Sequence, residues 1–489
     1  MLLIRDIDSI LTLDARRRIL ERHSVLIGEG KILRIGDAAT LDRDHLDTVR
    51  RAGKVIEGAG CMMLPAHVNT HVHTVEHLSR GLIPDDLATF EWASLYATPF
   101  CASLTEEEAY VSARLACLEM ISNGTGTFVD CNVLASLGHL DAVAQAVEES
   151  GMRAVLGRGV TDILPSAKRS MPEALQAAVC HPSTEAALAE VDALLSSGTE
   201  RAQGRIRLWA SIYGLMFFTS DALFRGIRAL ADRHGTPVAF HIASSREEAA
   251  LSESRTGKWP IGHLDDIDVL REDMLLTHCT LVTDEEVSRL ADRGAKVAYC
   301  PGAALRLAKG TTQVGRIPEM LAAGVTVSLG ADGVSSSGTF DPLRLAHLAA
   351  GLFKDARMDP TLVPAETALE MITVEGARAV LAEDSLGSIE EGKHADLTLY
   401  DTSGPEWAPG HDVVRTLIYS ADGRSVRTVI VDGAVIHEDG HSTRFDERDV
   451  IDGAREAAAR IASRLGLDPR PRWPLVESDE RMQSEGGTG

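Results

Sequence analysis

Three histidines lie within seven residues of an otherwise apolar stretch, in the sequence HVNTHVH at positions 67 to 73. Successive side chains of an extended backbone point to opposite faces, so His71 and His73, which are two residues apart, would share one face. Neutral imidazoles are ligands for Zn²⁺ and Fe²⁺. A lone buried histidine is more often structural, so this pair indicates a metal site only if further ligands reach the same place.

Further candidate ligands end later apolar runs of the sequence. His241 ends PVAFHI, His278 stands near the end of MLLTHC, and Asp332 ends VTVSLGAD. A catalytic Zn²⁺ keeps one coordination position for water and lowers the pKa of that water toward about 7, so that hydroxide forms at neutral pH. Asp332 can then be both ligand and proton acceptor, and His278 can donate a hydrogen bond to developing charge.

The elements that must position these residues alternate along the chain. Eight runs rich in Val, Ile and Leu recur between residues 63 and 332, and each is followed by a longer segment with helical periodicity. Several helical segments open on Thr, Ser or Asp and close on Gly, as helix caps do. Near-continuous apolar strands predict a parallel sheet covered by helices. Eight such units predict an α/β fold, a (β/α)8 TIM barrel over residues 63–384, with catalytic groups at the carboxyl ends of its strands.

Residues 1–62 and 385–445 have the texture of β structure. SVLIGEGKILRIG predicts a hairpin around Gly-Glu-Gly, and VRTVIVDGAVIHEDG predicts a tight turn at Asp432-Gly433. We expect the two segments to form one composite domain, a small β-sandwich. Residues 446–489 predict an amphipathic helix followed by a loose tail.

Composition limits the partners. The formal net charge of -23 argues against nucleic acid and anionic membranes, since both bind basic patches. The first residues, MLLIRDIDSILTLDARRR, do not resemble a secretory leader, and seven scattered cysteines form no Cys-x-x-Cys pair. We therefore expect a cytoplasmic protein with free thiols.

The motifs, in this order, resemble those of the amidohydrolase superfamily. MLPAHVNTHVHTVEHLSRGL is similar to the family's first strand segment, and LLTHCTLVTDEEVSRLADRGAKVAYCP and EMLAAGVTVSLGADG are similar to its sixth to eighth. LGSIEEGKHADLTLYD and VDGAVIHEDG resemble its returning β segments. The resemblance is nearest to the mononuclear branch of s-triazine chlorohydrolases and aminohydrolases, guanine deaminase and methylthioadenosine/S-adenosylhomocysteine deaminase.

This resemblance implies one divalent metal ion, Zn²⁺ or Fe²⁺. Carried over position by position, the ligands would be His71, His73, His241 and Asp332, with His278 a weak ligand or a neighbour of the ligands. Family analogy also implies a homodimer, and the apolar face of the predicted C-terminal helix would need a partner surface.

The sequence departs from the family pattern at informative positions. Ser244 stands where the family has a glutamate that protonates a ring nitrogen, and a hydroxyl is a poor proton donor. Glu247 and Glu248 are close in sequence, but the strand-to-helix geometry should point them away. Tyr213 stands near the end of strand four, where purine-nucleoside deaminases have a histidine, which argues against an adenosine-type substrate. Trp92, Tyr213 and Ser336 are candidates for lining the substrate pocket.

Three interpretations remain open. The first is deamination, in which activated water displaces an amino group from a nitrogen heteroaromatic ring, or a related hydrolysis of an amidine or cyclic amide. The second is hydrolytic dehalogenation of a chlorinated heteroaromatic, which Ser244 favours because chloride leaves without a proton. The third is a catalytically inactive scaffold that retains the metal.

Overall fold

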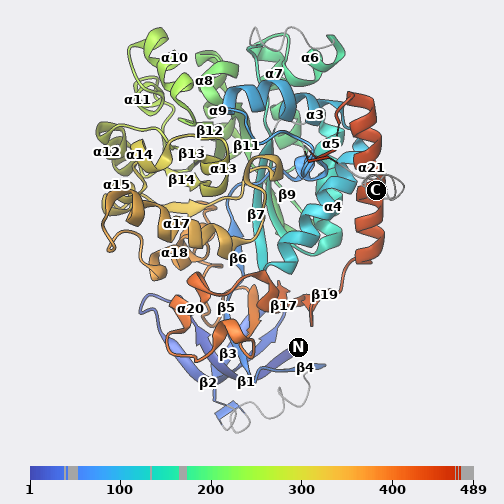
Figure 1. Cartoon of the computed structure of the whole chain (residues 1–489), viewed down its shortest axis with the longest axis vertical. Coiled ribbons are helices and arrows are strands. Elements are labelled where there is room, and N and C mark those ends of the chain that lie inside the picture. The colour runs from blue at the N-terminus through green and yellow to red at the C-terminus, as the bar shows by residue number, and fades with distance from the viewer. Residues whose placement is uncertain are drawn as a thin grey trace, which may run out of the picture.

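The computed structural model describes residues 1–37, 40–41, 53–132, 135–164, 173–468, 470–471 and 473–474. Figure 1 shows two regions: strands surrounded by helices in the upper part, and a sheet that carries the N-terminus in the lower part. The predicted loose tail lies, from residue 475 on, outside the described residues.

The upper region contains two five-stranded sheets made mainly of parallel strands. The first has the order β6 (His67–Asn69), β7 (Thr125–Asn132), β8 (Arg153–Arg158), β10 (Ile206–Leu208) and the short antiparallel β9 (Glu200–Arg201). The second has the order β11 (Ala210–Gly214), β12 (Val238–Ile242), β13 (Met274–His278), β14 (Lys296–Tyr299) and β15 (Val327–Leu329). Isolated parallel bridges join the two sheets at two places, Val72 with Asp332 and Val160 with Ile212.

Every one of the eight predicted apolar runs contains a strand, but two runs are divided. RIRLWASIYG breaks at Trp209 into β10 and β11, which pair in different sheets. MLPAHVNT breaks at Ala66, so that its first half belongs to β5 (Cys61–Pro65) of the lower sheet. A short apolar run predicts extended backbone and does not reveal which neighbouring strand each half pairs with.

Both faces of the parallel strands are buried, as the apolar runs predict. Phe240, Leu276 and Val297 join a large cluster with the surrounding helices. Their sequence neighbours Ala239, Leu275 and Ala298 belong to a second buried cluster. Residues of other strands and segments also belong to it, among them Val68, Val129, Val155, Trp209, Ala379 and Val380. This second cluster draws on strands of both sheets.

The helices that follow the strands begin at the expected caps. Thr105 and Thr283 each form a capping box, with Glu108 and Glu286 respectively. The helices of the upper region are α2 (Thr89–Glu91), α3 (Thr98–Ser103), α4 (Glu106–Ser122), α5 (Leu137–Ser150), α6 (Glu173–Val179), α7 (Thr184–Ser196), α8 (Leu215–Phe218), α9 (Asp221–His234), α10 (Arg246–Thr256), α11 (Pro260–Asp266), α12 (Asp284–Arg293), α13 (Pro301–Arg306), α14 (Thr311–Val314), α15 (Ile317–Ala322), α16 (Val334–Ser337), α17 (Pro342–Arg357), α18 (Ala365–Met371) and α19 (Val374–Ala379). Short turns of other helix types are η1 (Thr74–Ser79), η2 (Trp92–Ala97) and η4 (Ala202–Gly204).

The lower region is one nine-stranded sheet built from both ends of the chain. Its strands are β1 (Leu2–Leu11), β2 (Ile19–Gly28), β3 (Lys31–Gly36), β4 (Lys54–Glu57), β5, β16 (Leu397–Asp401), β17 (Val426–Val431), β18 (Ala434–Glu438) and β19 (His441–Ser442), accompanied by η5 (Pro405–Trp407), α20 (Val413–Tyr419) and η6 (Gly423–Ser425). The N- and C-terminal parts meet where β5 pairs antiparallel with β16. The predicted hairpins are β2–β3 and β17–β18, and Asp432 and Gly433 both have positive φ in the second turn.

The C-terminal helix α21 (Glu447–Leu465) packs on its own chain, against α4, α3 and η1. Val450, Ala457 and Ile461 on its apolar face are buried, and the Arg464 guanidinium contacts the Glu108 carboxylate at 2.6 Å. The apolar face therefore needs no second subunit, and the homodimer stays a prediction that rests on family analogy.

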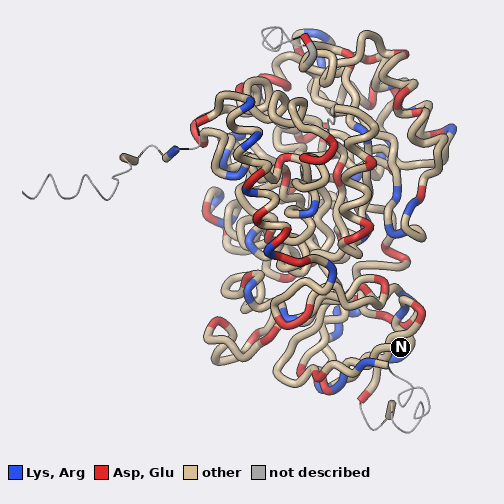
Figure 2. The backbone as a smooth tube through the Cα atoms, turned by 90° about the vertical axis from the view of Figure 1, so that its right-hand side faces the viewer, with Lys and Arg blue, Asp and Glu red and all other residues tan. Residues whose placement is uncertain are grey.

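Charged residues of both signs are interspersed along the chain, and the cysteines are free thiols, as we expected from the sequence. Lys and Arg lie among Asp and Glu along the same segments of the backbone (Figure 2). All seven cysteines are free thiols, and all but Cys180 are buried. Among the described residues, no helix has the length and apolar character needed to cross a membrane.

Candidate metal centre and catalytic site

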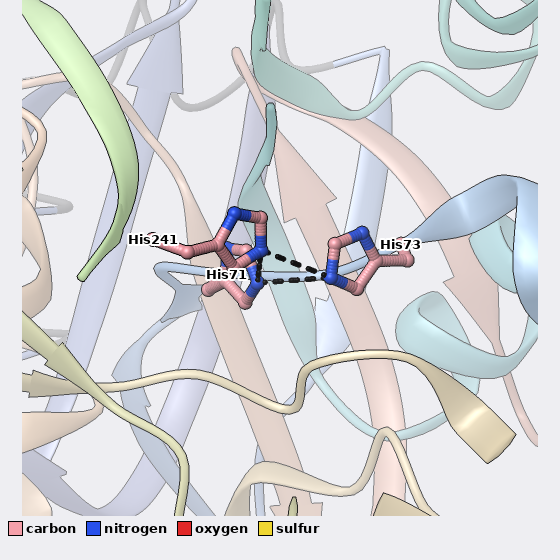
Figure 3. Close-up of side chains that lie close together, drawn as sticks. All are labelled: His71, His73 and His241. Carbon is pink, nitrogen blue, oxygen red and sulfur yellow. Dashed lines mark hydrogen bonds between the residues drawn. The ribbon is translucent and has the colours of Figure 1, made fainter. Parts of the chain in front are cut away.

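The predicted ligands come together at the carboxyl ends of the parallel strands. His71 and His73 directly follow β6, His241 lies near the end of β12, and Asp332 follows β15. His278 is the last residue of β13. All five side chains are buried. Figure 3 shows three of the imidazole rings pointing toward one another.

The Nε2 atoms of these three rings form a nearly equilateral triangle. The distances are 3.1 Å between His71 and His73, 3.1 Å between His71 and His241, and 3.3 Å between His73 and His241. Two nitrogens that each lie 2.0–2.1 Å from a tetrahedral Zn²⁺ are separated by about 3.3 Å. The triangle therefore has the size that a single zinc ion requires.

Asp332, which follows the edge strand β15 of the second sheet, completes the set of candidate ligands. Its Oδ1 lies 3.0 Å from the His73 Nε2 and 3.8 Å from the His71 Nε2, while Oδ2 lies 4.0 Å from the His278 Nε2. Asp332 and His278 have φ angles of 65° and 81°, in the left-handed region that ordinary residues avoid. Backbone strain of this kind persists where the surrounding structure enforces it, often at functional sites.

Hydrogen bonds on the far side of the rings fix their orientation. The His241 Nδ1–H donates to the Tyr213 carbonyl at 2.8 Å, because a carbonyl can only accept. The neutral ring therefore presents an unprotonated Nε2 to the centre. The His71 Nδ1 lies 3.2 Å from the Thr277 hydroxyl. Metal-ligating histidines commonly have such partners on the second ring nitrogen.

The electrostatics of the cluster favour a cation at its centre. Burial, reinforced by the charge of His73, lowers the pKa of His241 to about 3. Burial opposes ionisation of Asp332, but the hydrogen bond and charge of His73 hold its pKa well below the ordinary value. Burial lowers the pKa of His73, whereas the charges of Glu76 and then Asp332 raise it to about 9. The carboxylates thus attract one positive charge, which a divalent ion would supply while leaving the imidazoles neutral.

Ser244 meets a partner that the sequence analysis did not find. Its hydroxyl accepts a hydrogen bond of 2.8 Å from the Lys309 ammonium, which also lies 3.4 Å from the His278 Nδ1. The Glu248 carboxylate accepts the backbone N–H of Ser244 at 2.7 Å, whereas Glu247 is exposed.

The candidate pocket residues differ in how closely they approach the site. The centres of the Tyr213 and His241 rings lie 4.9 Å apart. The Trp92 Nε1–H donates to the Ser335 hydroxyl at 3.1 Å, and that hydroxyl donates to the Glu76 carboxylate at 3.0 Å. The Ser336 hydroxyl instead donates to a backbone carbonyl within its own turn. The pocket roles of Trp92, Tyr213 and Ser336 stay predictions.

Glu76 and Lys309 are two buried charged residues beside the site that the sequence did not lead us to expect. Glu76 stands three residues after His73, so its closeness in sequence could have marked it as a neighbour of the site once His73 was taken as a ligand. Lys309 follows α13, far in sequence from the residues it contacts, and no local pattern marks it.

Comparisons with known proteins agree with this geometry. Residues 62–436 match the model of the amidohydrolase family. A 5-methylthioadenosine/S-adenosylhomocysteine deaminase of Desulforamulus reducens is 33% identical over 463 residues, which cover 93% of this chain and 98% of the relative. A 5'-deoxyadenosine deaminase of Methanosarcina mazei is 33% identical over 458 residues, 93% of this chain and 97% of the relative. Among solved structures, an adenosine deaminase of Xanthomonas campestris with bound zinc is 27% identical and superposes with a TM-score of 0.82, covering 94% of this chain and 98% of that one.

Proposed function

The chain belongs to the amidohydrolase family, and from this premise we propose that it is a metal-dependent hydrolase that deaminates a nitrogen-containing heteroaromatic ring. The bond broken is a carbon–nitrogen bond other than a peptide bond. The observation that carries the proposal is the buried triangle of His71, His73 and His241 Nε2 atoms with Asp332 beside it. The deaminase names of the relatives support the reaction.

These residues would hold one Zn²⁺ per chain, as the zinc-bound structural relative supports. When bound, the ion would supply Lewis acidity and lower the pKa of a water molecule toward about 7. Asp332 would take a proton from that water, because it is ionised at neutral pH. His278, 4.0 Å from Asp332, would hydrogen-bond to the charge that develops as the oxygen adds to the ring.

We further propose that the two parallel sheets close into a (β/α)8 barrel over residues 63–384. The two bridges between the sheets and the cluster shared by strands of both sheets support this closure. Residues 1–62 and 385–445 would then form the β domain, and residues 446–489 the C-terminal appendage. The free state of all seven cysteines supports a cytoplasmic location.

Metal analysis and ammonia release test the proposed function together. The wild type should contain about one metal ion per chain and release ammonia from an amino-substituted heterocycle among cytosine, guanine, isoguanine, adenosine and aminotriazines. His73→Ala and His241→Ala should each lose the metal and the activity. His441→Ala, at an exposed position in the β domain, is the matched control and should retain both. Full ammonia release by metal-free protein would contradict the proposal.

A further inference from the structure

A buried lysine lies beside the candidate metal centre. Lys309 belongs to the turn after α13, and its side chain is directed inward while its neighbours Ala308 and Gly310 both have positive φ. Only 5% of the residue is exposed. Burying a cation without a paired anion is strongly unfavourable, so a lysine in this position requires an explanation.

The contacts of the Lys309 ammonium are neutral groups. Its Nζ donates to the Ser244 hydroxyl at 2.8 Å and lies 3.4 Å from the His278 Nδ1. Among the described residues the Lys309 ammonium forms no ion pair: burial lowers its pKa, and the charges of Asp332 and Glu248 oppose this shift from beyond ion-pair distance. An ammonium has three N–H donors, and the structure assigns partners to two of them. One donor of a buried cation is therefore available to a bound molecule.

The position of this donor relates it to the reaction. Ser244 follows β12 three residues after His241, and His278 ends β13, so Lys309 is held against two strand ends of the site. His278 in turn lies 4.0 Å from Asp332. A group bound to Lys309 would therefore lie close to the carbon that receives the oxygen of water.

We propose that Lys309, oriented by Ser244, binds an oxo group or ring oxyanion of the substrate, so that the substrate class is oxo-substituted amino heterocycles rather than adenosine-type nucleosides. This inference rests on the proposed deamination. A hydrogen bond from a cation to an oxyanion is about twice as strong as one between neutral groups. A neutral adenine ring offers no such oxygen.

The chemistry balances without a further reactant. Water adds its oxygen to the ring carbon, the bond from that carbon to the amino nitrogen breaks, and ammonia leaves. One proton of the water passes through Asp332 to the leaving nitrogen, and the other stays on the product. The negative charge that builds up in the ring spreads to the oxo oxygen, where the Lys309 ammonium stabilises it without transferring a proton.

Matched substrates test the assignment on the metal-loaded enzyme. Isoguanine differs from adenine by one oxo group, and ammeline has one oxo group in place of an amino group of melamine. The wild type should favour the oxo member of at least one pair by tenfold or more in kcat/KM. Lys309→Met should lower kcat/KM on that member by about 10²–10³-fold, the typical effect of one preorganised donor, and leave the metal content unchanged. Lys309→Arg should retain part of the preference. Lys296→Met, a half-buried lysine at the start of β14, is the control.

Binding measurements separate this inference from the proposed function. Xanthine and cyanurate carry oxo groups but no amino group, so titration calorimetry measures their affinity without turnover. At least one should bind the wild type, and Lys309→Met should weaken that binding tenfold or more.

Unchanged binding by Lys309→Met, no binding of either compound, or an equal loss of activity on both members of a pair would overturn the inference. Failure of every amino heterocycle to release ammonia, with Lys309-dependent binding intact, would overturn only the deamination. If Lys309→Met fails to fold, ligand binding and the kcat/KM preference are both measured with Lys309→Arg. A Lys309→Arg protein that binds the ligands as the wild type does but has lost the oxo preference would overturn the inference.

Discussion

Replacing Ser244 by glutamate restores the acid that the family pattern contains and directly tests the role of its lysine neighbour. The Ser244 hydroxyl lies 2.8 Å from the Lys309 ammonium, so a carboxylate at this position would form an ion pair with it. Opposite unit charges about 4 Å apart attract by about 4 kcal/mol at an effective dielectric constant near 20. This attraction would hold Lys309 against the new carboxylate and remove its donor from the substrate. Since one preorganised donor contributes about 10²–10³-fold, kcat/KM should fall by a similar factor.

The assay is steady-state ammonia release with the best substrate of the panel, with metal content measured on the same samples. Ser244→Gln introduces a side chain of similar size without the charge and should lower the rate less than Ser244→Glu. The double variant Ser244→Glu, Lys309→Met should be no more active than Ser244→Glu. A tenfold or larger increase in kcat for Ser244→Glu would refute the reasoning, because it would show that the reaction lacks a proton donor and that Lys309 does not fill its place.

Three further predictions concern the proton acceptor, the Glu119 carboxylate that contacts His77 and Arg80, and the C-terminal helix. Asp332→Asn should lower kcat by about 10²–10⁴-fold, the usual contribution of a positioned base, in the same ammonia assay; a loss below tenfold would exclude Asp332 as the acceptor. Burial raises the pKa of Glu119, but its hydrogen bonds and the charges of His77 and Arg80 lower it to about 2 from 4.5, so its stabilisation is complete above pH 4.5 and is lost as the pH falls toward 2. Glu119→Gln should therefore reduce the free energy of unfolding in urea at pH 7 by up to about 3 kcal/mol, and by less because solvent screens the charge of half-exposed Arg80. The difference in free energy from wild type should be smaller at pH 3.5. An equal difference at both pH values would contradict the lowered pKa of Glu119. Ile461→Ala in α21 should cost about 2–5 kcal/mol of stability without changing the mass measured by light scattering, whereas dissociation of an oligomer would show that α21 faces a second subunit.

Local patterns in the sequence predicted the parallel strands and several helix starts. The run PVAFHI predicts β12 because buried parallel strands are apolar on both faces, and Thr283 with Glu286 predicts the start of α12 because a capping box satisfies the free N–H groups there. Pairing was harder to predict. The break of one run at Trp209 depends on which strand lies beside each half, and that information is absent from the run itself.

The site divides in the same way. His71, His73, His241 and Asp332 were predictable because strand ends in a parallel fold converge, so position along a strand implies position in space. Lys309 was not predictable, because it belongs to a turn whose path depends on packing against Ser244 and His278. The missing glutamate at position 244 indicated that something must compensate, but it gave no indication of the residue.

Whether a metal ion drives the reaction is tested by measuring the metal content and the activity of the purified protein before and after chelation. We expect about one zinc ion per chain, loss of ammonia release when the ion is removed, and recovery when one equivalent of Zn²⁺ is restored. Full activity in protein shown by elemental analysis to contain no divalent metal would contradict this expectation.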